Sequence, residues 1–358
     1  MIPQGEEERV TRRPVFTNDY SVTAHPAVLA EITSLNTRTF AGYGMDELCS
    51  QAESWILELC GTPSGCVRFI VGGTQVNDIA IDSFLRPWQS VLCATTGHIA
   101  THEAGAIENS GHSIQLLASH DGLLDPSEVE DFILQWRDGG MREHLAEPGL
   151  VCISQPTELG TLYSLERLEA LSEVCHAHGL VLYIDGARMG YGLGATTNDV
   201  TLKDIARLSD AFTIGGTKCG ALGAEALVLP RHEECEHLRP LMKIHGGLLA
   251  KGWLLGAQFL ALLRRGDYFT VTREATSRAQ RIRRAFEEAG FEMLVDSPTN
   301  QIFPIVPLDV WEDLSSRFEL LEWERLSPDR VCARVVVSWS TTKEDEAAIL
   351  EWIAKVSK

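Results

Sequence analysis

The chain has 358 residues, 44% of them hydrophobic, which is enough for a large core and for two domains. Its 31 basic and 50 acidic residues give a formal net charge of −19, and this excess of acid argues against a nucleic-acid partner, which needs a basic surface. No apolar run reaches the roughly 18 residues that a membrane-spanning helix needs, so we expect no membrane partner.

The start of the chain and its cysteines indicate a compartment. The first ten residues, Met1 to Val10, lack the basic-then-apolar order of a secretory signal peptide. The nine cysteines lack CxxC spacing, and several, such as Cys93 and Cys152, lie in apolar runs, where a reduced cysteine acts as a small hydrophobic residue. We therefore expect a cytoplasmic protein without a disulfide framework.

Seven short apolar runs alternate with helix-like stretches along the first two thirds of the chain. They are Val67–Val71, Val91–Cys93, Ile114–Leu117, Leu150–Ser154, Leu180–Ile184, Ala211–Ile214 and Ala226–Leu229. Strands that alternate with helices are typical of a mostly parallel sheet covered on both faces, which binds ligands at the carboxyl ends of its strands. The sequence therefore predicts an α/β fold with a seven-stranded, mostly parallel sheet.

One of the intervening helices can be placed closely. Apolar residues recur at helical spacing from Leu165 to Val174, Ser164 stands before them as an N-cap, and Gly179 follows as a stop.

Beyond about Gly256 the pattern changes to a long helix followed by strands. A helical stretch rich in Arg and Glu, around Thr270–Ala289, precedes the segment Phe291–Val295, and the segment Ala333–Trp339 follows later. A final helix is expected from about Lys343. We therefore predict a large domain over residues 1–255, which includes an N-terminal arm, and a small α+β domain over 256–358.

The segment Phe69–Asn77 runs from a strand through glycines into the expected start of a helix. Gly73 lets the backbone approach an anion, the N–H groups at a helix N-terminus favour phosphate, and Thr74 adds a hydroxyl donor. The same pattern also occurs in tight connections that bind nothing. Asp185 and Lys218, further along the chain, favour the phosphate interpretation.

Two histidines, His98 and His102, lie four residues apart near the end of the next strand. Such a pair, with Glu103, could bind zinc, although the HExxH frame is absent. The pair could also be hydrogen-bonded near the core, or His98 could stack on a cofactor ring and move protons. We favour stacking. The cluster His232–His237 is interpreted as a solvated helix turn rather than a metal site, so no metal is predicted.

The runs that end in Asp185-Gly-Ala-Arg188 and Gly215-Gly-Thr-Lys218 each deliver a charged residue at the carboxyl end of a strand. This pair suits pyridoxal phosphate, because the lysine forms a Schiff base with the aldehyde and the carboxylate keeps the pyridine nitrogen protonated. Arg188 could form a structural bridge with Asp185. The favoured alternative is that Arg188 binds the phenolic oxygen of the cofactor or a substrate carboxylate.

Arg334 is expected at the start of the strand Val335–Trp339 in the small domain. An exposed arginine at a strand end is one interpretation. The other is a guanidinium fork for the α-carboxylate of an amino-acid substrate, which the small domain would bring over the cofactor.

With these segments assembled, the chain resembles the threonine aldolase / aromatic β-eliminating lyase family of fold-type-I pyridoxal phosphate enzymes. Five motifs occur in the order and spacing of that family, and the resemblance covers nearly the whole chain. They are Ala41-Gly-Tyr-Gly44, Gly72-Gly-Thr-Gln-Val-Asn77, Gly97-His-Ile-Ala-Thr-His-Glu-Ala-Gly-Ala106, Asp185-Gly-Ala-Arg188 and Gly215-Gly-Thr-Lys218.

The resemblance implies a role for each matching residue. It makes Lys218 the Schiff-base lysine, Asp185 the partner of the pyridine nitrogen, and His98 the residue that stacks on the ring. Gly73 and Thr74 would hold the phosphate, and a neighbouring subunit would add Lys251 near it. The substrate carboxylate would meet Asn18, Arg188 and Arg334.

The chain departs from the family in two segments. Some members have an Asn-Thr-His segment whose histidine touches the β-hydroxyl of the substrate, and here the corresponding stretch is Gln155-Pro-Thr157-Glu158. A Gly-Gly-Gly-Met-Arg segment appears here as Gly246–Lys251, without its arginine. The general base is therefore assigned to His98 first and to His102 second.

The resemblance implies an aldolase that cleaves L-threonine or L-allo-threonine to glycine and an aldehyde, in a homodimer or homotetramer with shared active sites. Another pyridoxal phosphate reaction (β-elimination, racemisation or phenylserine cleavage) is the alternative among enzymes, because one carbanion serves them all. The alternative from a different class of protein is a non-catalytic α/β protein that binds a phosphate ligand. Such a protein would not need Lys218.

Overall fold

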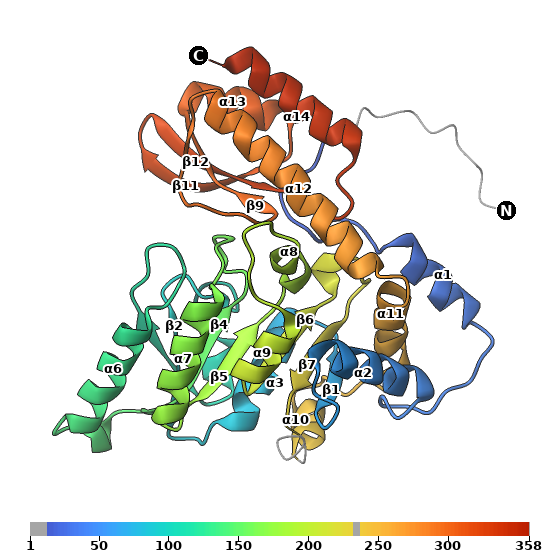
Figure 1. The fold of residues 1–358 in the computed structure, drawn as a ribbon, viewed down its shortest axis with the longest axis vertical. Helices are drawn as coiled ribbons and strands as arrows, with labels where there is room; N and C mark the ends of the chain where they lie inside the picture. The colour runs from blue at the N-terminus through green and yellow to red at the C-terminus, as the bar shows by residue number, and fades with distance from the viewer. Residues whose placement is uncertain (1–12, 232–236, 358) are drawn as a thin grey trace.

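The computed structural model describes residues 13–231 and 237–357, which form a large α/β layer structure with a smaller sheet above it (Figure 1). The strands of the large sheet are β1 (Cys66–Ile70), β2 (Gln89–Ala94), β3 (Ser113–Leu117), β4 (Glu147–Ser154), β5 (Val181–Asp185), β6 (Ala211–Gly215) and β7 (Glu225–Leu229). Their order is β1-β7-β6-β5-β4-β2-β3, and β7 alone runs against the other strands. The predicted seven-stranded, mostly parallel sheet is confirmed.

Helices cover both faces of this sheet, as a buried parallel sheet requires. The helices of this part are α1 (Pro26–Ser34), α2 (Glu47–Cys60), α3 (Gly73–Phe84), α4 (His98–Thr101), α5 (Ala106–Asn109), α6 (Pro126–Asp138), α7 (Leu165–Ala177), α8 (Met189–Leu193), α9 (Leu202–Leu208), α10 (Leu238–Ile244) and α11 (Trp253–Leu263), with 3-10 turns η1 (Arg142–His144) and η2 (Thr217–Cys219). Helices α2, α6, α7, α9 and α11 pack on one face, and α3, α4, α5 and α10 on the other.

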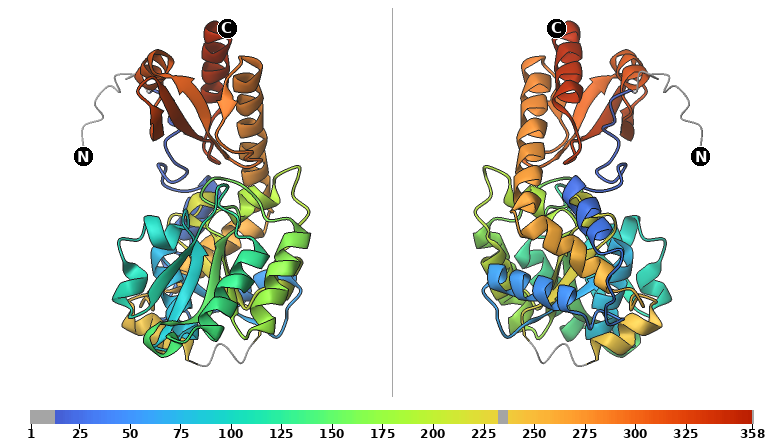
Figure 2. Two further views of the ribbon diagram at one scale, coloured as in Figure 1. Left: turned by 90° about the vertical axis from the view of Figure 1, so that its left-hand side faces the viewer. Right: turned by 90° about the vertical axis from the view of Figure 1, so that its right-hand side faces the viewer.

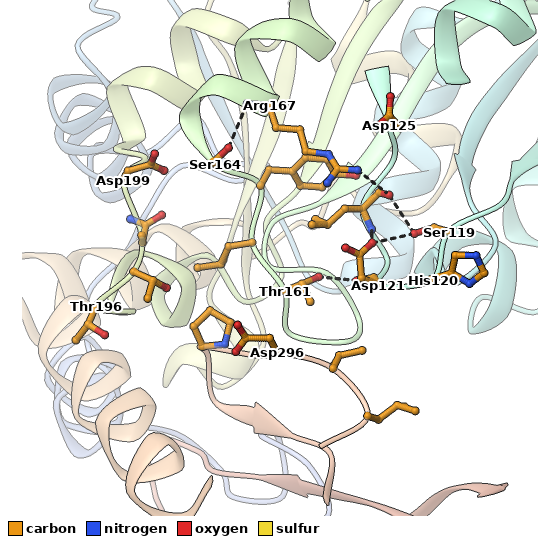
Figure 3. Close-up of a pocket in the computed structure, with 18 of the residues that line it drawn as sticks. Ser119, His120, Asp121, Asp125, Thr161, Ser164, Arg167, Thr196, Asp199 and Asp296 are labelled. Carbon is orange, nitrogen blue, oxygen red and sulfur yellow. Dashed lines mark hydrogen bonds between the residues drawn. The ribbon is translucent and has the colours of Figure 1, made fainter. Parts of the chain in front are cut away.

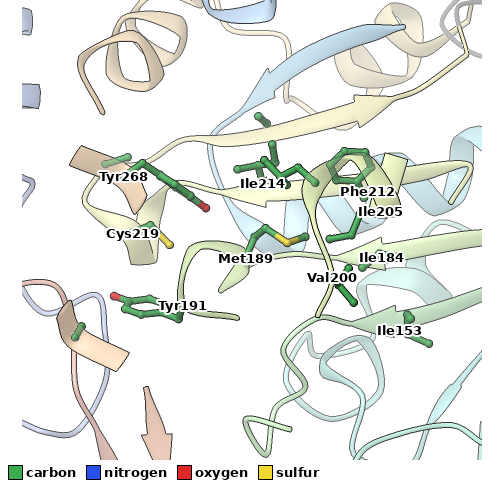
Figure 4. Close-up of a cluster of buried hydrophobic side chains, with 14 of the residues drawn as sticks. Ile153, Ile184, Met189, Tyr191, Val200, Ile205, Phe212, Ile214, Cys219 and Tyr268 are labelled. Atoms are coloured by element: carbon green, nitrogen blue, oxygen red, sulfur yellow. The ribbon is translucent and has the colours of Figure 1, made fainter. Parts of the chain in front are cut away.

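Successive side chains of each strand point to opposite faces of the sheet, so each strand contributes to two hydrophobic clusters. In β5, Leu182 and Ile184 belong to the cluster under α7 and α9, while Tyr183 belongs to the opposite cluster under α3. Figure 4 shows part of the first cluster, where Ile184 and Phe212 lie in the sheet beside Ile205 of α9. Both faces of the central strands are therefore apolar, which explains the unbroken hydrophobic runs of the sequence.

The smaller part is an antiparallel sheet backed by two long helices (Figure 2). Its elements are α12 (Asp267–Glu288), β8 (Glu292–Met293), β9 (Gln301–Ile302), β10 (Pro304–Pro307), α13 (Leu308–Arg317), β11 (Leu321–Ser327), β12 (Arg330–Val336) and α14 (Lys343–Val356). The predicted boundary at residues 255/256 falls inside α11, which packs against α1 and α2 of the large part.

The N-terminal arm joins the two parts. The Phe16 N–H donates to the Glu319 carbonyl at 2.8 Å, and the Phe16 carbonyl accepts from the Val336 N–H at 2.8 Å, so the arm lies against the small sheet. A few residues later Asp19 is fully buried beside the large sheet, and α1 follows there. The arm thus contacts the small sheet through Phe16 and the large part through Asp19.

Several local predictions can be compared with the structure. Helix α7 begins at Leu165 with Ser164 as its N-cap, as predicted, and Gly179 has the left-handed φ of 72° that ends a helix readily. Among the described cysteines seven are free and buried and Cys66 is disulfide-bonded, whereas the sequence analysis expected no disulfide framework. Among the described helices none is both long and apolar enough to cross a membrane.

Candidate active site

Asp185 and Lys218 lie at neighbouring strand ends. Asp185 is the last residue of β5, and Lys218 lies in the η2 turn just after β6. Because β5 and β6 are parallel neighbours, their carboxyl ends meet at the same edge of the sheet. The two residues line one narrow cavity of about 30 Å³, together with Gly73, His98 and Arg188. Five residues singled out from the sequence are thus brought together.

The Asp185 carboxylate is buried and held by two donors. Its Oδ2 accepts from Asn77 Nδ2 at 3.0 Å, and its Oδ1 accepts from the Ala187 N–H at 2.9 Å. Asn77, on α3, is itself fixed because its Oδ1 accepts from the Tyr183 hydroxyl at 2.7 Å. These bonds fix the orientation of a carboxylate that could pair with a protonated ring nitrogen.

Lys218 is placed to act as a neutral amine. Burial lowers the pKa of Lys218, and the positive charge of Arg188 lowers it further. A lower pKa raises the share of uncharged amine at neutral pH, and only the uncharged amine attacks a carbonyl.

His98 is fixed by a buried glutamate, Glu103, which the sequence analysis considered only as a zinc ligand. Its Nδ1 lies 2.7 Å from Oε1 of Glu103, and the same oxygen accepts from Asn77 Nδ2 at 2.8 Å. Asn77 therefore links the partner of His98 to Asp185. Both Asn77 and Glu103 stand inside the motifs quoted from the sequence, but only the fold shows which groups they join.

His102 stacks on His98 rather than forming a metal site with it. The two rings lie 5.5 Å apart with an interplanar angle of 18°, and His102 Nδ1 is 2.6 Å from the Thr101 hydroxyl. Burial lowers the pKa of His102, and the neighbouring His98, Arg334 and Lys218 lower it further. This shift favours the uncharged form of His102 at neutral pH. No cluster of three metal-ligating side chains is found in the described part of the chain, and residues 232–236 of the His232–His237 segment lie outside it.

The turn before α3 fits a phosphate group. Gly72 is the N-cap, and the first helical bond runs from the Val76 N–H to the Gly72 carbonyl, so the preceding N–H groups have no partner within the helix. A Cβ atom built at Gly72 or Gly73 would meet nothing within 4 Å, which shows open space beside these N–H groups. Thr74 lies in the same turn. With Lys218 and Asp185 in the adjoining cavity, the residues present fit pyridoxal phosphate.

Arg188 pairs with Asp19 and not with Asp185. Its Nε and Nη2 donate to the two oxygens of Asp19 at 2.7 and 3.1 Å, and Asn300 donates to Asp19 as well. Burial opposes the charge of Asp19, but Arg188 and Lys218 outweigh it and lower the pKa of Asp19. This ion pair does not use Arg188 Nη1, for which no hydrogen bond is found among the described residues. Asp19 was missed because only Asn18, its neighbour, was suggested by the resemblance.

Arg334 lies inside β12, not at its start, and lines an open cleft of about 510 Å³. Its Nη2 donates to the Thr17 carbonyl at 3.2 Å, its guanidinium lies 5.2 Å from the Trp323 ring, and its buried Nε has no hydrogen-bond partner within the described residues. Burial lowers the pKa of Arg334, with a further contribution from Arg188. An unsatisfied guanidinium N–H beside Arg188 suits a carboxylate.

Besides Thr74 of the α3 turn, two residues that the resemblance suggested do not line these cavities. Asn18 accepts hydrogen bonds from the Tyr20 N–H and the Ser21 hydroxyl in a local turn, both at 2.9 Å. Lys251 is exposed next to Ala250, whose carbonyl accepts from the Tyr43 N–H. Their predicted roles require either movement of the arm or a second subunit.

A larger cavity, of about 840 Å³, lies elsewhere between the two parts of the molecule (Figure 3). Asp121 and Arg167 line it from the large part and Asp296 from the small part. Arg167 is already bonded to the carbonyls of Leu123 and Leu124. None of the residues predicted for cofactor or substrate lines this cavity.

A strand-end lysine and aspartate beside a helix N-terminus would suit pyridoxal phosphate, and the fold is that of the fold-type-I pyridoxal phosphate enzymes. Residues 23–307 match the model of the beta-eliminating lyase family, and the chain belongs to that family. It is 29% identical to a low specificity L-threonine aldolase of Pseudomonas sp. (strain NCIMB 10558) over 294 residues, which cover 80% of this chain and 83% of the relative.

Solved structures extend the similarity to the whole fold. A threonine aldolase of Leishmania major superposes with a TM-score of 0.93 at 38% identity, over 96% of this chain and all of that one. A Thermus thermophilus aspartate aminotransferase, at 13% identity and a TM-score of 0.69, shares the fold alone.

Proposed function

We propose that the protein is a pyridoxal phosphate-dependent aldolase that cleaves L-threonine or L-allo-threonine to glycine and an aldehyde. The observation that carries this proposal is the shared cavity of Asp185 and Lys218 beside the open N-terminus of α3. The similarity to threonine aldolases narrows the reaction to cleavage of a carbon–carbon bond.

The cofactor, when bound, supplies an aldehyde that captures amines and a ring that takes up the electron pair of the broken bond. Lys218 provides the amine that holds it. Asp185 keeps the ring nitrogen protonated, and the first turn of α3 with Thr74 holds the phosphate. His98 packs on the ring, and Glu103 fixes the orientation of that histidine.

The substrate is held by its carboxylate. Arg188 and Arg334 both line the cleft that opens from Lys218, and each has guanidinium N–H groups without a described partner. Two such contacts at one carboxylate restrict rotation about the bond to Cα. The orientation of the substrate then determines which bond at Cα is broken.

The function is tested by incubating the purified protein with L-threonine, L-allo-threonine and phenylserine and identifying the products. We expect glycine and the matching aldehyde. Formation of pyruvate and ammonia from serine, or racemisation without release of an aldehyde, would show that the protein catalyses one of the other pyridoxal phosphate reactions and not the aldolase reaction.

A shared active site is the next prediction. Among the described residues, the cavity beside the α3 turn contains no lysine or arginine apart from Arg188 and Lys218, yet the phosphate carries negative charge. We expect Lys251 of a second subunit to supply a cation, since closed pairs are the commonest oligomers. Lys251→Ala should then weaken pyridoxal phosphate binding about 10-fold or more, the loss typical of a charge-assisted contact. Lys355→Ala, at an exposed lysine of α14, is the matched control.

Subunit exchange decides whether the site is shared. Mixed dimers of Lys218→Ala and Lys251→Ala chains contain one intact site if Lys251 acts across the interface, so activity should return on mixing. Proven exchange without recovery, or a fully active monomer, contradicts the shared site.

A cytoplasmic location also remains part of the proposal.

A further inference from the structure

Four side chains line both the narrow cavity that holds Asp185 and the open cleft under Arg334. They are His98, Glu158, Arg188 and Lys218. A group that lines both spaces lies where the cofactor side of the site meets the substrate side. Arg188 and Lys218 already have roles in the proposed function, and the Nδ1 of His98 is bonded to Glu103. Glu158 is the carboxyl group among them, and it has no task in the proposed function so far.

Glu158 is anchored through one of its two oxygens. It lies in the loop after β4, where its Oε1 accepts from the His98 N–H at 2.9 Å and from the Ser154 hydroxyl at 2.7 Å. No hydrogen bond to Oε2 is found among the described residues. The side chain is therefore held in place while its second oxygen remains able to accept a proton.

The surroundings of Glu158 also suit proton transfer. Burial raises the pKa of Glu158, although the hydrogen bond from Ser154 opposes the shift. A raised pKa makes a carboxylate a better proton acceptor, which is what a general base requires. Glu322, another carboxylate on the cleft, is exposed and bonded by two nitrogens of Arg325, so it does not compete for this task.

Resting on the aldolase function proposed above, we propose that Glu158 is the catalytic base that takes the proton of the substrate β-hydroxyl group. The O–H electron pair becomes the second C–O bond of the aldehyde, and the Cα–Cβ bond breaks with its pair left on Cα. A proton from water is then added at Cα, and the product glycine leaves. Glu158 releases its proton to water in the open cleft. His98 and His102 are then not needed as bases.

The variant Glu158→Gln separates this role from a structural one. The amide oxygen of glutamine can still accept from His98 and Ser154, but the side chain cannot take up a proton. We expect threonine cleavage to fall about 100-fold or more, as for loss of a general base. Exchange of the glycine α-proton with D₂O, followed by NMR, needs no β-hydroxyl group and should stay within about threefold of wild type. The spectrum of bound cofactor, its dissociation constant and the melting temperature should also stay unchanged.

Each outcome decides one question. Cleavage within about threefold of wild type shows that Glu158 only anchors the loop, and an equal fall in cleavage and exchange shows that it supports the site as a whole; either result overturns the proposal. A wild-type protein that exchanges the glycine proton but cleaves no β-hydroxy amino acid refutes the aldolase function instead. Glu322→Gln, on the same cleft, is the matched control and should leave both reactions intact.

Discussion

Replacing Lys218 with alanine is expected to abolish turnover and to remove the visible absorbance of the cofactor-loaded protein. The reason is that Lys218 provides the amine in the cavity it shares with Asp185, where burial lowers its pKa and favours the uncharged form. The absorbance spectrum before and after borohydride treatment, with a steady-state assay, measures both losses.

The control for this experiment is a lysine remote from the cavity. Lys203→Ala, on α9 of the large part, should keep its colour and its rate. Circular dichroism must show that the Lys218→Ala protein is folded. A borohydride-reducible adduct at a different lysine in that variant would overturn the assignment of Lys218.

Replacing Asp185 with asparagine is expected to leave pyridoxal phosphate bound but to lower the cleavage rate by roughly two orders of magnitude or more, which is about 3 kcal/mol of the activation barrier. A neutral amide does not stabilise a protonated pyridine nitrogen, so the ring loses most of its capacity to hold an electron pair. Single-turnover measurements on cofactor-saturated protein give this rate without interference from binding.

A second route tests Asp185 without changing the Asn77 contact. Wild-type protein reconstituted with a cofactor analogue that has carbon in place of the ring nitrogen should show a comparable loss. If the Asp185→Asn protein works within a few-fold of wild type, Asp185 is a structural residue at the end of β5 and the hydrogen bond from Asn77 only stabilises that loop.

The architecture was predictable because its physical signals are local. Central strands such as β5 are buried on both faces, so they appear in the sequence as unbroken apolar runs between polar helices. Helix α7 was predicted to within a residue because Ser164 and Gly179 mark its ends. The predicted boundary at residues 255/256 falls within α11, because that helix is apolar throughout and the polar helix α12 begins only after it.

The site was predictable only where a residue ends a strand or stands in a motif. Lys218 and Asp185 are of this kind, whereas Asp19 is joined to Arg188 across 169 positions and has no local signal. Glu158 was noted only as the place where a histidine is missing. Its anchoring by Ser154 and by the backbone of His98 depends on how the β4 loop folds over α4.

The path of the N-terminal arm has a consequence for how the protein is made. Thr17 and Arg334 are in contact although 317 positions separate them, and Phe16 pairs with residues 319 and 336. At about 5–20 residues per second, a ribosome takes roughly 15 to 60 seconds to span that interval. The sheet that carries Lys218 is complete long before then, while the arm, Asp19 and the Arg334 strand are not yet assembled. A nascent chain can therefore present Asp185 and Lys218 before the arm and the Arg334 strand come together.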